Sequence, residues 1–313
     1  MAIFRGAPRA LVRMSDRPVE PAAPAITVGM PVFNDVAFLR ESLDSVLAQT
    51  FTDFALIISD DASTDGSEQI CMEYAHKDAR ITFVQQPRNL GISRNMRFLR
   101  DQARSPYFAW VGDDDLWDQQ FLERLWRSLE ARPSAVVAFC TYVFIDDHGR
   151  PMGRERDFNY GAATPARRLK GFLQKSDDCF GYGLIRAAAV RDAPFPRWPW
   201  PNRDQAYNNI FPSLCHYLVE GDYVHVSGAP LYFKRVKATE ALRHNRRAGS
   251  GVWELIRFTT RRFYLACYSF AAICRAGGVL LGARMLPRMF YRWFFATAGR
   301  EWGAALAGKW VAR

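Results

Sequence analysis

Short apolar runs rich in β-forming residues alternate with amphipathic helical stretches through the first half of the chain, and this alternation limits the fold most strongly. Buried strands are predicted at 26–33, 54–59, 81–85, 107–111 and 135–145. Helices are predicted from a cap at Asn34 or Asp35 through Gln49, at 67–77, within 88–103 and at 118–131. This alternation predicts a mostly parallel α/β sheet covered on both faces.

Polar and acidic side chains gather where three of the predicted strands end, at Phe33–Asp35, Asp60–Asp65 and Asp113–Asp115. In parallel α/β sheets, ligands bind beyond the carboxyl ends of the strands. Three adjacent aspartates in "WVGDDDLW" (110–117) repel one another unless a cation, a hydrogen-bond donor or water compensates. Each cluster alone is also typical of a polar loop, but their coincidence at one edge predicts a ligand site.

Several common enzyme classes are disfavoured because their motifs do not occur. The sequence contains no GxxxxGK[ST], GxGxxG, HExxH or GxSxG pattern, which argues against P-loop NTPases, Rossmann-type dinucleotide enzymes, zinc proteases and α/β-hydrolases. The 6 cysteines are scattered without CxxC spacing. We therefore expect reduced thiols, as in a cytosolic protein, and neither a disulfide framework nor a zinc site.

Five motifs in order resemble the family 2 glycosyltransferases that have a GT-A fold. They read "VGMPVFND" (28–35), "ESLDSVLAQTFTDFALIISDDASTDGS" (41–67), "NLGISRN" (89–95), "WVGDDDLW" (110–117) and "PNRDQAYN" (201–208). The resemblance runs from about Ile26 to Ala238. It implies a Rossmann-like, mixed but mostly parallel sheet flanked by helices. It also implies an inverting transfer of a sugar from a nucleotide-diphosphate sugar to a hydroxyl of a glycan or lipid-linked acceptor, as in bacterial surface-polysaccharide synthesis.

A divalent metal, Mn²⁺ or Mg²⁺, is the cofactor that this resemblance implies. It would neutralise the charge on the departing diphosphate and would prefer hard carboxylate oxygens. By its position in the motif, Asp114 is the expected ligand and Asp113 the expected ribose or neighbouring partner. Asp115 is the second candidate ligand, because the three aspartates also fit a D-x-D pattern; alternatively, it caps the following helix.

The donor nucleotide is expected at the ends of the first two predicted strands. Asp61 matches the family position that accepts a hydrogen bond from the base, but a carboxylate suits uracil, thymine and guanine alike. Pro31 and Phe33 would line the base pocket, and Phe33 lacks the hydroxyl of the tyrosine that many members have there. Arg94 fits a phosphate contact, with a plain surface cation as the alternative. Basic residues near Lys234 approach the donor phosphates in some members.

Asp204 is the expected catalytic base for the acceptor hydroxyl. Family members commonly have a Glu-Asp pair at this point, whereas this chain has Arg203 before Asp204. This departure leaves other carboxylates open as candidates, namely Asp177, Asp178 and Asp222. It is also the one feature that favours a non-catalytic scaffold subunit of a glycan-assembly complex. A sugar-phosphate nucleotidyltransferase is the other alternative, although "VGMPVFND" lacks the Gly-rich signature of that class.

Positive charge is concentrated at the end of the chain. The net charge is +10, and residues 243–313 contain 13 Lys or Arg but only 2 Asp or Glu. We expect a flexible lead-in (1–24), a GT-A domain (25–240) and a C-terminal helical segment (241–313). Within this last segment, 263–283 is nearly apolar and 288–302 mixes arginines with aromatic residues.

That composition favours an in-plane membrane anchor. A helical extension packed on the domain or on a partner, and a transmembrane helix, are the two alternatives. The expected location is cytoplasmic, peripheral to the inner face of the membrane. The apolar content argues against nucleic acid as a partner, and a homo-oligomer is compatible with the sequence.

Overall fold

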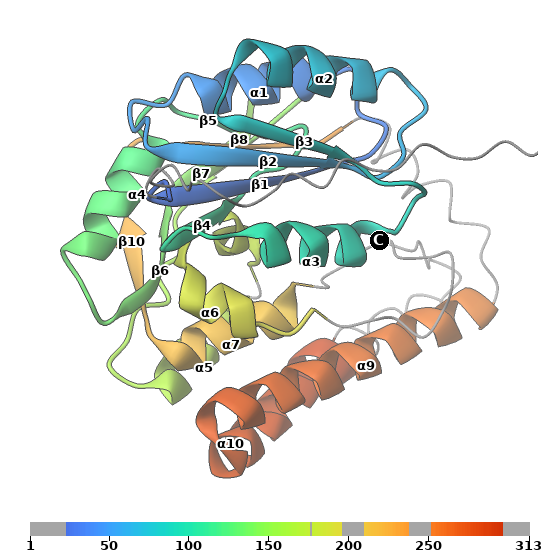
Figure 1. The fold of residues 1–313 in the computed structure, drawn as a ribbon. Coiled ribbons are helices and arrows are strands. Elements are labelled where there is room, and N and C mark those ends of the chain that lie inside the picture. Colours follow the sequence, from blue (N-terminus) through green and yellow to red (C-terminus); the bar gives the residue numbers. More distant parts are fainter. Residues whose placement is uncertain (1–22, 176, 196–209, 238–251, 297–313) are drawn as a thin grey trace, which may run out of the picture.

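A seven-stranded sheet with helices on both faces forms the centre of the molecule (Figure 1). The computed structural model describes residues 23–175, 177–195, 210–237 and 252–296. The strand order is β10-β6-β9-β4-β1-β2-β3. Its strands are β1 (Ile26–Val32), β2 (Phe54–Asp60), β3 (Ile81–Gln85), β4 (Tyr107–Trp110), β6 (Ala135–Cys140), β9 (Leu184–Arg186) and β10 (Asp222–Val226). β9 is antiparallel to both of its neighbours, and every other pairing is parallel. The mostly parallel sheet is therefore confirmed.

A second, four-stranded sheet lies next to the acidic edge, in the order β5-β11-β7-β8. Its strands are β5 (Leu116–Trp117), β7 (Tyr142–Ile145), β8 (Pro151–Arg156) and β11 (Tyr232–Arg235). β5 follows the aspartates directly and pairs with β11, so that β11 is held beside the aspartate loop.

The helices cover the sheet because each has one apolar face. In Figure 1, α1 and α2 lie above the sheet, whereas α3, α6 and α7 lie below it. These and the other helices of the domain are α1 (Leu39–Leu47), α2 (Ser67–Lys77), α3 (Ile92–Gln102), α4 (Phe121–Glu130), α5 (Pro165–Lys175), η1 (Cys179–Tyr182), α6 (Ala187–Asp192) and α7 (Phe211–Glu220). In α1, Leu39, Leu43 and Val46 are fully buried, as their helical spacing requires.

Two local predictions from the sequence are wrong. The apolar run at 135–145 is two strands, because the chain leaves the large sheet at Thr141 and pairs with β8 and β11 instead. Neither Asn34 nor Asp35 caps α1 with its side chain, since the helix begins at Leu39. The carboxamide oxygen of Asn34 instead accepts a hydrogen bond from the Thr64 N–H at 2.8 Å.

The described C-terminal residues form a helical hairpin, α9 (Val252–Gly277) and α10 (Val279–Met289), followed by the short π-helix η3 (Phe290–Phe295). Gly278 makes the turn between the helices with a φ of +82°, which favours glycine. Pro287 lies inside α10, although proline usually ends or kinks a helix. The hairpin packs along α7 and α5, below the sheet in Figure 1.

This packing agrees with the alternative in which the C-terminal segment is a helical extension packed on the domain. None of the helices in the described ranges combines the length and the hydropathy that crossing a bilayer requires. The expected domain boundary near residue 240 falls within 238–251, outside the described residues. All 6 cysteines are free thiols, as expected.

Candidate active site

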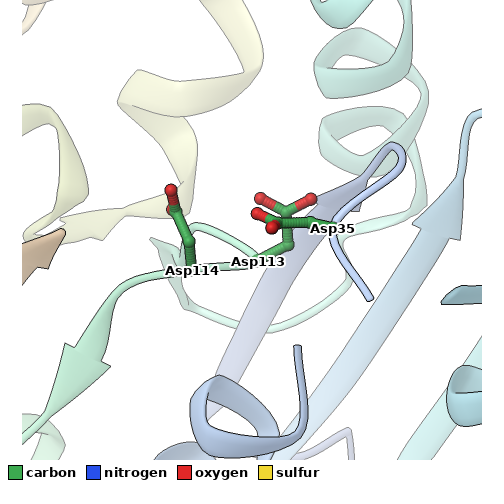
Figure 2. Close-up of side chains that lie close together, drawn as sticks. All are labelled: Asp35, Asp113 and Asp114. Atoms are coloured by element: carbon green, nitrogen blue, oxygen red, sulfur yellow. The ribbon is translucent and has the colours of Figure 1, made fainter. Parts of the chain in front are cut away.

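Three carboxylates from two strand ends meet at the acidic edge of the large sheet. Asp35 follows β1, while Asp113 and Asp114 follow β4, and the adjacent parallel pairing of these strands brings the two loops together. One carboxylate oxygen from each of the three residues lies within 4.8 Å of the others (Figure 2). The sequence indicated Asp113 and Asp114, but it did not indicate that Asp35 faces them.

The carboxylates crowd one another enough to disfavour their charged forms. Burial, followed by the neighbouring Asp114 and Asp35 charges, raises the pKa of Asp113 well above its usual range. Burial also raises the pKa of Asp35 to about 6, although Lys237 opposes that shift. The Phe33 N–H donates to Asp113 Oδ2 at 3.1 Å and fixes its orientation. A cation at this point would relieve the repulsion.

The Lys237 ammonium is a cation that lies in this cluster. Its Nζ is 2.7 Å from Asp114 Oδ2 and also contacts Asp35 Oδ2. Burial would lower the pKa of Lys237, but the carboxylates of Asp114 and Asp113 raise it above its usual value. The hard oxygens of the three carboxylates are the ligand type that Mg²⁺ and Mn²⁺ prefer, so these residues are the candidates to hold such an ion.

Asp115 is not part of the cluster that Asp35, Asp113 and Asp114 form. It is buried, its carboxylate accepts hydrogen bonds from the Tyr232 hydroxyl and from the Arg235 N–H, and Lys234 Nζ lies 3.8 Å from its Oδ2. It does not cap α4, which begins at Phe121. The structure thus joins Asp115 to β11 and not to the other two aspartates.

Arg235 fixes the position of the aspartate loop through several hydrogen bonds. Its buried guanidinium donates to the Asp114 carbonyl at 2.9 Å, to the Asp146 and Asp147 carbonyls at 3.0 and 3.1 Å, and to Glu41 Oε2 at 2.6 Å. No pattern in the sequence indicates this role of Arg235, because a lone arginine at the end of a strand gives no signal of it. Lys234 is also engaged, with its ammonium 4.3 Å from the Tyr182 ring centroid.

The second acidic cluster shapes the loop that leads into α3. Asp61 is buried at the end of β2, and its two carboxylate oxygens accept the N–H groups of Leu90 and Gly91 at 2.6 and 2.9 Å. This anchors the start of α3, where Arg94 is exposed in the first turn. Asp61, Arg94 and the aspartate loop therefore share the carboxyl edge of the sheet.

The expected base-pocket residues lie on β1 and just after it. Pro31 is half-buried opposite Ser59 of β2, and Phe33 is 47% exposed. The loops after the two strands are joined by hydrogen bonds from the Asn34 N–H to Ser63 Oγ at 2.9 Å and from the Val36 N–H to Asp65 Oδ2 at 2.9 Å.

The expected base, Asp204, lies outside the described residues. Among the other candidates, Asp222 begins β10 opposite Ala135 and so lies at the amino edge of the sheet, away from the aspartates. Asp177 accepts the Tyr142 hydroxyl at 2.5 Å. Asp178 is closest in character to a site residue, because burial raises its pKa while the nearby Lys234, which also faces Asp115, lowers it.

The sequence model of glycosyl transferase family 2 matches residues 27–193, which contain both acidic clusters. The chain belongs to this family. The match includes Asp35, Asp61 and the aspartate loop, and it ends before β11 and Lys237.

Three known relatives each match less than half of this chain. Glycosyltransferase GlyA of Streptococcus pneumoniae is 31% identical over 40% of the chain and 18% of GlyA. MJ1057 of Methanocaldococcus jannaschii, an uncharacterized glycosyltransferase, is 32% identical over 40% of the chain and 44% of MJ1057. TuaG of Bacillus subtilis, provisionally named a teichuronic acid biosynthesis glycosyltransferase, is 32% identical over 42% of the chain and 52% of TuaG. The chain thus spans at most about half of these proteins.

Solved structures extend the likeness to most of the chain, at the level of the fold. Staphylococcus aureus TarS 1–349 in complex with UDP has a TM-score of 0.64 at 18% identity, covering 90% of this chain and 74% of the TarS chain. The mannosyltransferase PcManGT from Pyrobaculum calidifontis, in complex with GDP-Man and Mn²⁺, has a TM-score of 0.51 at 16% identity, covering 93% of this chain and 79% of that one. The GT-A fold expected from the sequence is confirmed.

Proposed function

We propose that this protein is an inverting, metal-assisted glycosyltransferase that transfers a sugar from a nucleotide-diphosphate sugar to a hydroxyl of a glycan or lipid-linked acceptor. The observation that carries the proposal is the meeting of Asp35, Asp113 and Asp114 at the carboxyl edge of a family 2 sheet. The chain's similarity to TarS and PcManGT, which were solved with a nucleotide and a nucleotide sugar, supports a donor of this class.

Mn²⁺ or Mg²⁺ is the proposed cofactor, held by Asp114 with Asp113 and Asp35 beside it. These three carboxylates fit a divalent metal ion, because their oxygens are hard ligands and the Lys237 ammonium already lies among them. When bound, such an ion supplies positive charge that stabilises the departing diphosphate. Asp115 is a weaker candidate ligand, because Tyr232 and Arg235 already use both of its oxygens.

The donor nucleotide is proposed to lie over the ends of β1 and β2. Asp61 would accept the donor group of the base, because it occupies the position that does so in the family and an ionised carboxylate is a hydrogen-bond acceptor. Pro31 and Phe33 would flank the base, and Asp113 would orient the ribose. Arg94, exposed at the start of α3, would meet the phosphates.

Asp204 is proposed as the base that removes the proton from the acceptor hydroxyl as its oxygen attacks the anomeric carbon. Attack from the face opposite the leaving nucleotide inverts that carbon. Asp178 is the alternative base, and its raised pKa would favour proton acceptance near neutral pH over a fully solvated carboxylate.

A thermal-shift panel tests the donor and metal sites together. UDP-, GDP- and dTDP-sugars are each added with and without Mn²⁺ to the wild type, to Asp114→Ala and to the surface control Asp101→Ala. Ligand at a hundred times its dissociation constant stabilises a protein by about 2.7 kcal/mol. We expect one donor to give a Mn²⁺-dependent shift that persists in Asp101→Ala and disappears in Asp114→Ala. Absence of a shift with every donor would contradict the proposal.

Two other functions make different predictions in the same experiments. A non-catalytic scaffold subunit would bind a nucleotide sugar with metal but would not turn it over. A sugar-phosphate nucleotidyltransferase would be stabilised by a free nucleoside triphosphate with metal, and would release diphosphate from it. Release of a nucleoside diphosphate from a nucleotide sugar, in the presence of lipid-linked glycan extracts, identifies the glycosyltransferase. Release of pyrophosphate from a nucleoside triphosphate and a sugar phosphate identifies the nucleotidyltransferase, and the scaffold gives neither product.

We further propose that the protein acts at the inner face of the membrane, bound peripherally. The basic and aromatic composition of the C-terminal segment and a lipid-linked acceptor both favour this setting. Co-sedimentation of the full chain with membrane fractions, reversed by high salt, is the expected result; a fully soluble chain at low salt would contradict it.

A further inference from the structure

Exposed apolar side chains are concentrated on the C-terminal hairpin. Residues 252–296 make up 45 of the 245 described residues, yet they provide 6 of the 10 large exposed hydrophobic side chains. These are Ile256, Phe263, Val279, Leu280, Tyr291 and Phe295. Single exposed apolar residues scattered over the surface are normal in a soluble protein, whereas a concentration of them is typical of a binding surface.

The turn between the two helices carries the most exposed of these residues. Val279 is 71% exposed and Leu280 is 89% exposed, directly after Gly278. The hairpin extends along the side of the molecule opposite α1 and α2 in Figure 1, so its turn projects at one end of that side. Within the described part of the chain, these two adjacent aliphatic side chains face solvent and are not part of the hydrophobic core.

The exposed surface that begins at Val279 and Leu280 continues along one side of α10, with helical spacing. Gly282, Met285 and Met289 are buried against the protein, whereas Leu280, Arg284, Pro287, Arg288 and Tyr291 face outward. α10 is therefore apolar on both sides, with arginines added only on the outer one. Tyr291, in η3, is 68% exposed.

The outer face is strongly basic. Residues 252–296 contain 7 arginines and a single acidic residue, Glu254. Arg275 at the end of α9, and Arg284 and Arg288 on α10, are all exposed. Within the described ranges, no carboxylate forms a salt bridge with any of these three.

We propose that this outer face of α9, α10 and η3 lies in the plane of an anionic phospholipid bilayer. Val279 and Leu280 insert at the boundary between headgroups and acyl chains, and Arg275, Arg284 and Arg288 contact lipid phosphates. This inference rests on the proposed membrane setting and identifies the surface that provides it. A second copy of the chain is a poorer occupant, because a two-fold contact would bring two faces of the same charge together.

Vesicle flotation tests the surface with the full chain. The wild type, a Val279→Asp/Leu280→Asp variant and an Arg284→Glu/Arg288→Glu variant are mixed with phosphatidylglycerol or phosphatidylcholine vesicles. Met72→Asp is the matched control, since Met72 is an exposed apolar residue outside the hairpin, 42% exposed on α2. We expect the wild type and Met72→Asp to float with phosphatidylglycerol vesicles, and each hairpin variant to lose about tenfold or more of its partitioning.

Three results would overturn the inference. The wild type does not float with anionic vesicles, or it floats equally with phosphatidylcholine at low salt, or the Val279→Asp/Leu280→Asp variant floats like the wild type. Sedimentation velocity without lipid covers the competing occupant: a concentration-dependent dimer that the same variant abolishes would assign the face to a second copy.

The same preparations are tested for donor and Mn²⁺ binding by thermal shift. Retained donor binding with lost flotation supports the surface independently of the active site. Retained flotation with no donor binding would leave the membrane surface in place and contradict the proposed enzymatic function instead.

Discussion

Lys237 is the residue whose role the geometry defines most sharply, because it places a positive charge where a metal ion would bind. Replacing it with methionine, which keeps most of its length, removes a cation 2.7 Å from Asp114 Oδ2. We expect Lys237→Met to bind Mn²⁺ roughly tenfold more tightly than the wild type in the absence of donor, since a competing charge is gone. Mn²⁺ titration followed by electron paramagnetic resonance measures this directly.

Lys234→Met is the matched control for that comparison, since Lys234 meets Asp115 and Tyr182 and not the three-carboxylate cluster. Unchanged or weaker Mn²⁺ binding in Lys237→Met would show that the ammonium does not compete with the ion. If Lys237 binds the donor diphosphate as well, the same variant will need more nucleotide sugar for an equal thermal shift.

Asp35 makes the stability of the metal-free protein depend on pH. Its pKa is raised to about 6 by burial, above the value of about 3.9 for an unfolded aspartate. A raised pKa in the folded state means that folding favours the protonated Asp35 carboxyl. The contribution of Asp35 to the free energy of unfolding is therefore fully present below pH 4 and is lost as pH rises through 6. The loss amounts to about 3 kcal/mol at most. Urea unfolding in EDTA at pH 4 to 7 should show the wild type losing stability relative to Asp35→Asn.

Added Mn²⁺ should reduce that difference, because the ion stabilises the ionised carboxylates that the pH rise creates. Parallel pH profiles for the wild type and Asp35→Asn in EDTA would mean that Asp35 titrates in the folded protein as it does in the unfolded chain.

Arg235 illustrates why lysine is not an equivalent cation at a buried, multiply bonded position. Its guanidinium serves Glu41 and three backbone carbonyls, one of them that of Asp114. Arg235→Lys leaves several of these acceptors without a donor, which we expect to cost about 2–4 kcal/mol of unfolding free energy. Arg40→Lys is the control, because the Arg40–Glu73 pair is on the surface and its arginine side chain is 50% exposed. Equal denaturation midpoints for the two variants would refute this role of Arg235.

At the scale of elements, the sequence predicted the parts that local pattern determines. The helix at 67–77 and the strand at 81–85 agree with α2 and β3 residue for residue. The run at 135–145 misled, because both of its halves are buried and apolar, and only tertiary pairing decides where one sheet ends. Asp113 and Asp114 were found from their motif, whereas Asp35 and Lys237, which are 202 residues apart, are joined only by the folded arrangement.

Gly282 tests how closely α10 packs on α9. A methyl group at this position would overlap Cys274 Sγ and would lie 3.1 Å from the Phe270 ring. We expect Gly282→Ala to lower the unfolding free energy by about 1–3 kcal/mol. The double variant Gly282→Ala/Cys274→Ala should recover part of that loss, because the overlapping sulfur is removed. Ala283→Gly, one residue along on the exposed side, controls for helix propensity; strictly additive effects of the first two substitutions would exclude the proposed clash.

At the scale of the whole molecule, the described C-terminal helices belong to the packed body of the protein. α9 lies along α7, and Leu265, Ala266 and Ile273 are buried in this contact layer together with Met285 of α10. α7 in turn packs on β6, so one continuous apolar layer connects the hairpin with the central sheet. The hairpin's inner face stabilises the fold while its outer face remains available for binding.

Removing the C-terminal hairpin should therefore lower the stability of the fold, in addition to any effect on membrane binding. A chain that ends at Arg246 exposes the apolar side of α7, where Leu214, Cys215 and Leu218 are fully buried in the full chain. We expect it to unfold at a lower temperature, to bind a hydrophobic dye and to aggregate, because the exposed apolar area is no longer covered. The Val279→Asp/Leu280→Asp variant, which leaves the inner face intact, should keep the wild-type melting temperature within a few degrees. If instead the shortened chain melts like the full one and stays monomeric, the hairpin contributes nothing to the core, and membrane fractionation of the shortened chain becomes a valid test of the anchor.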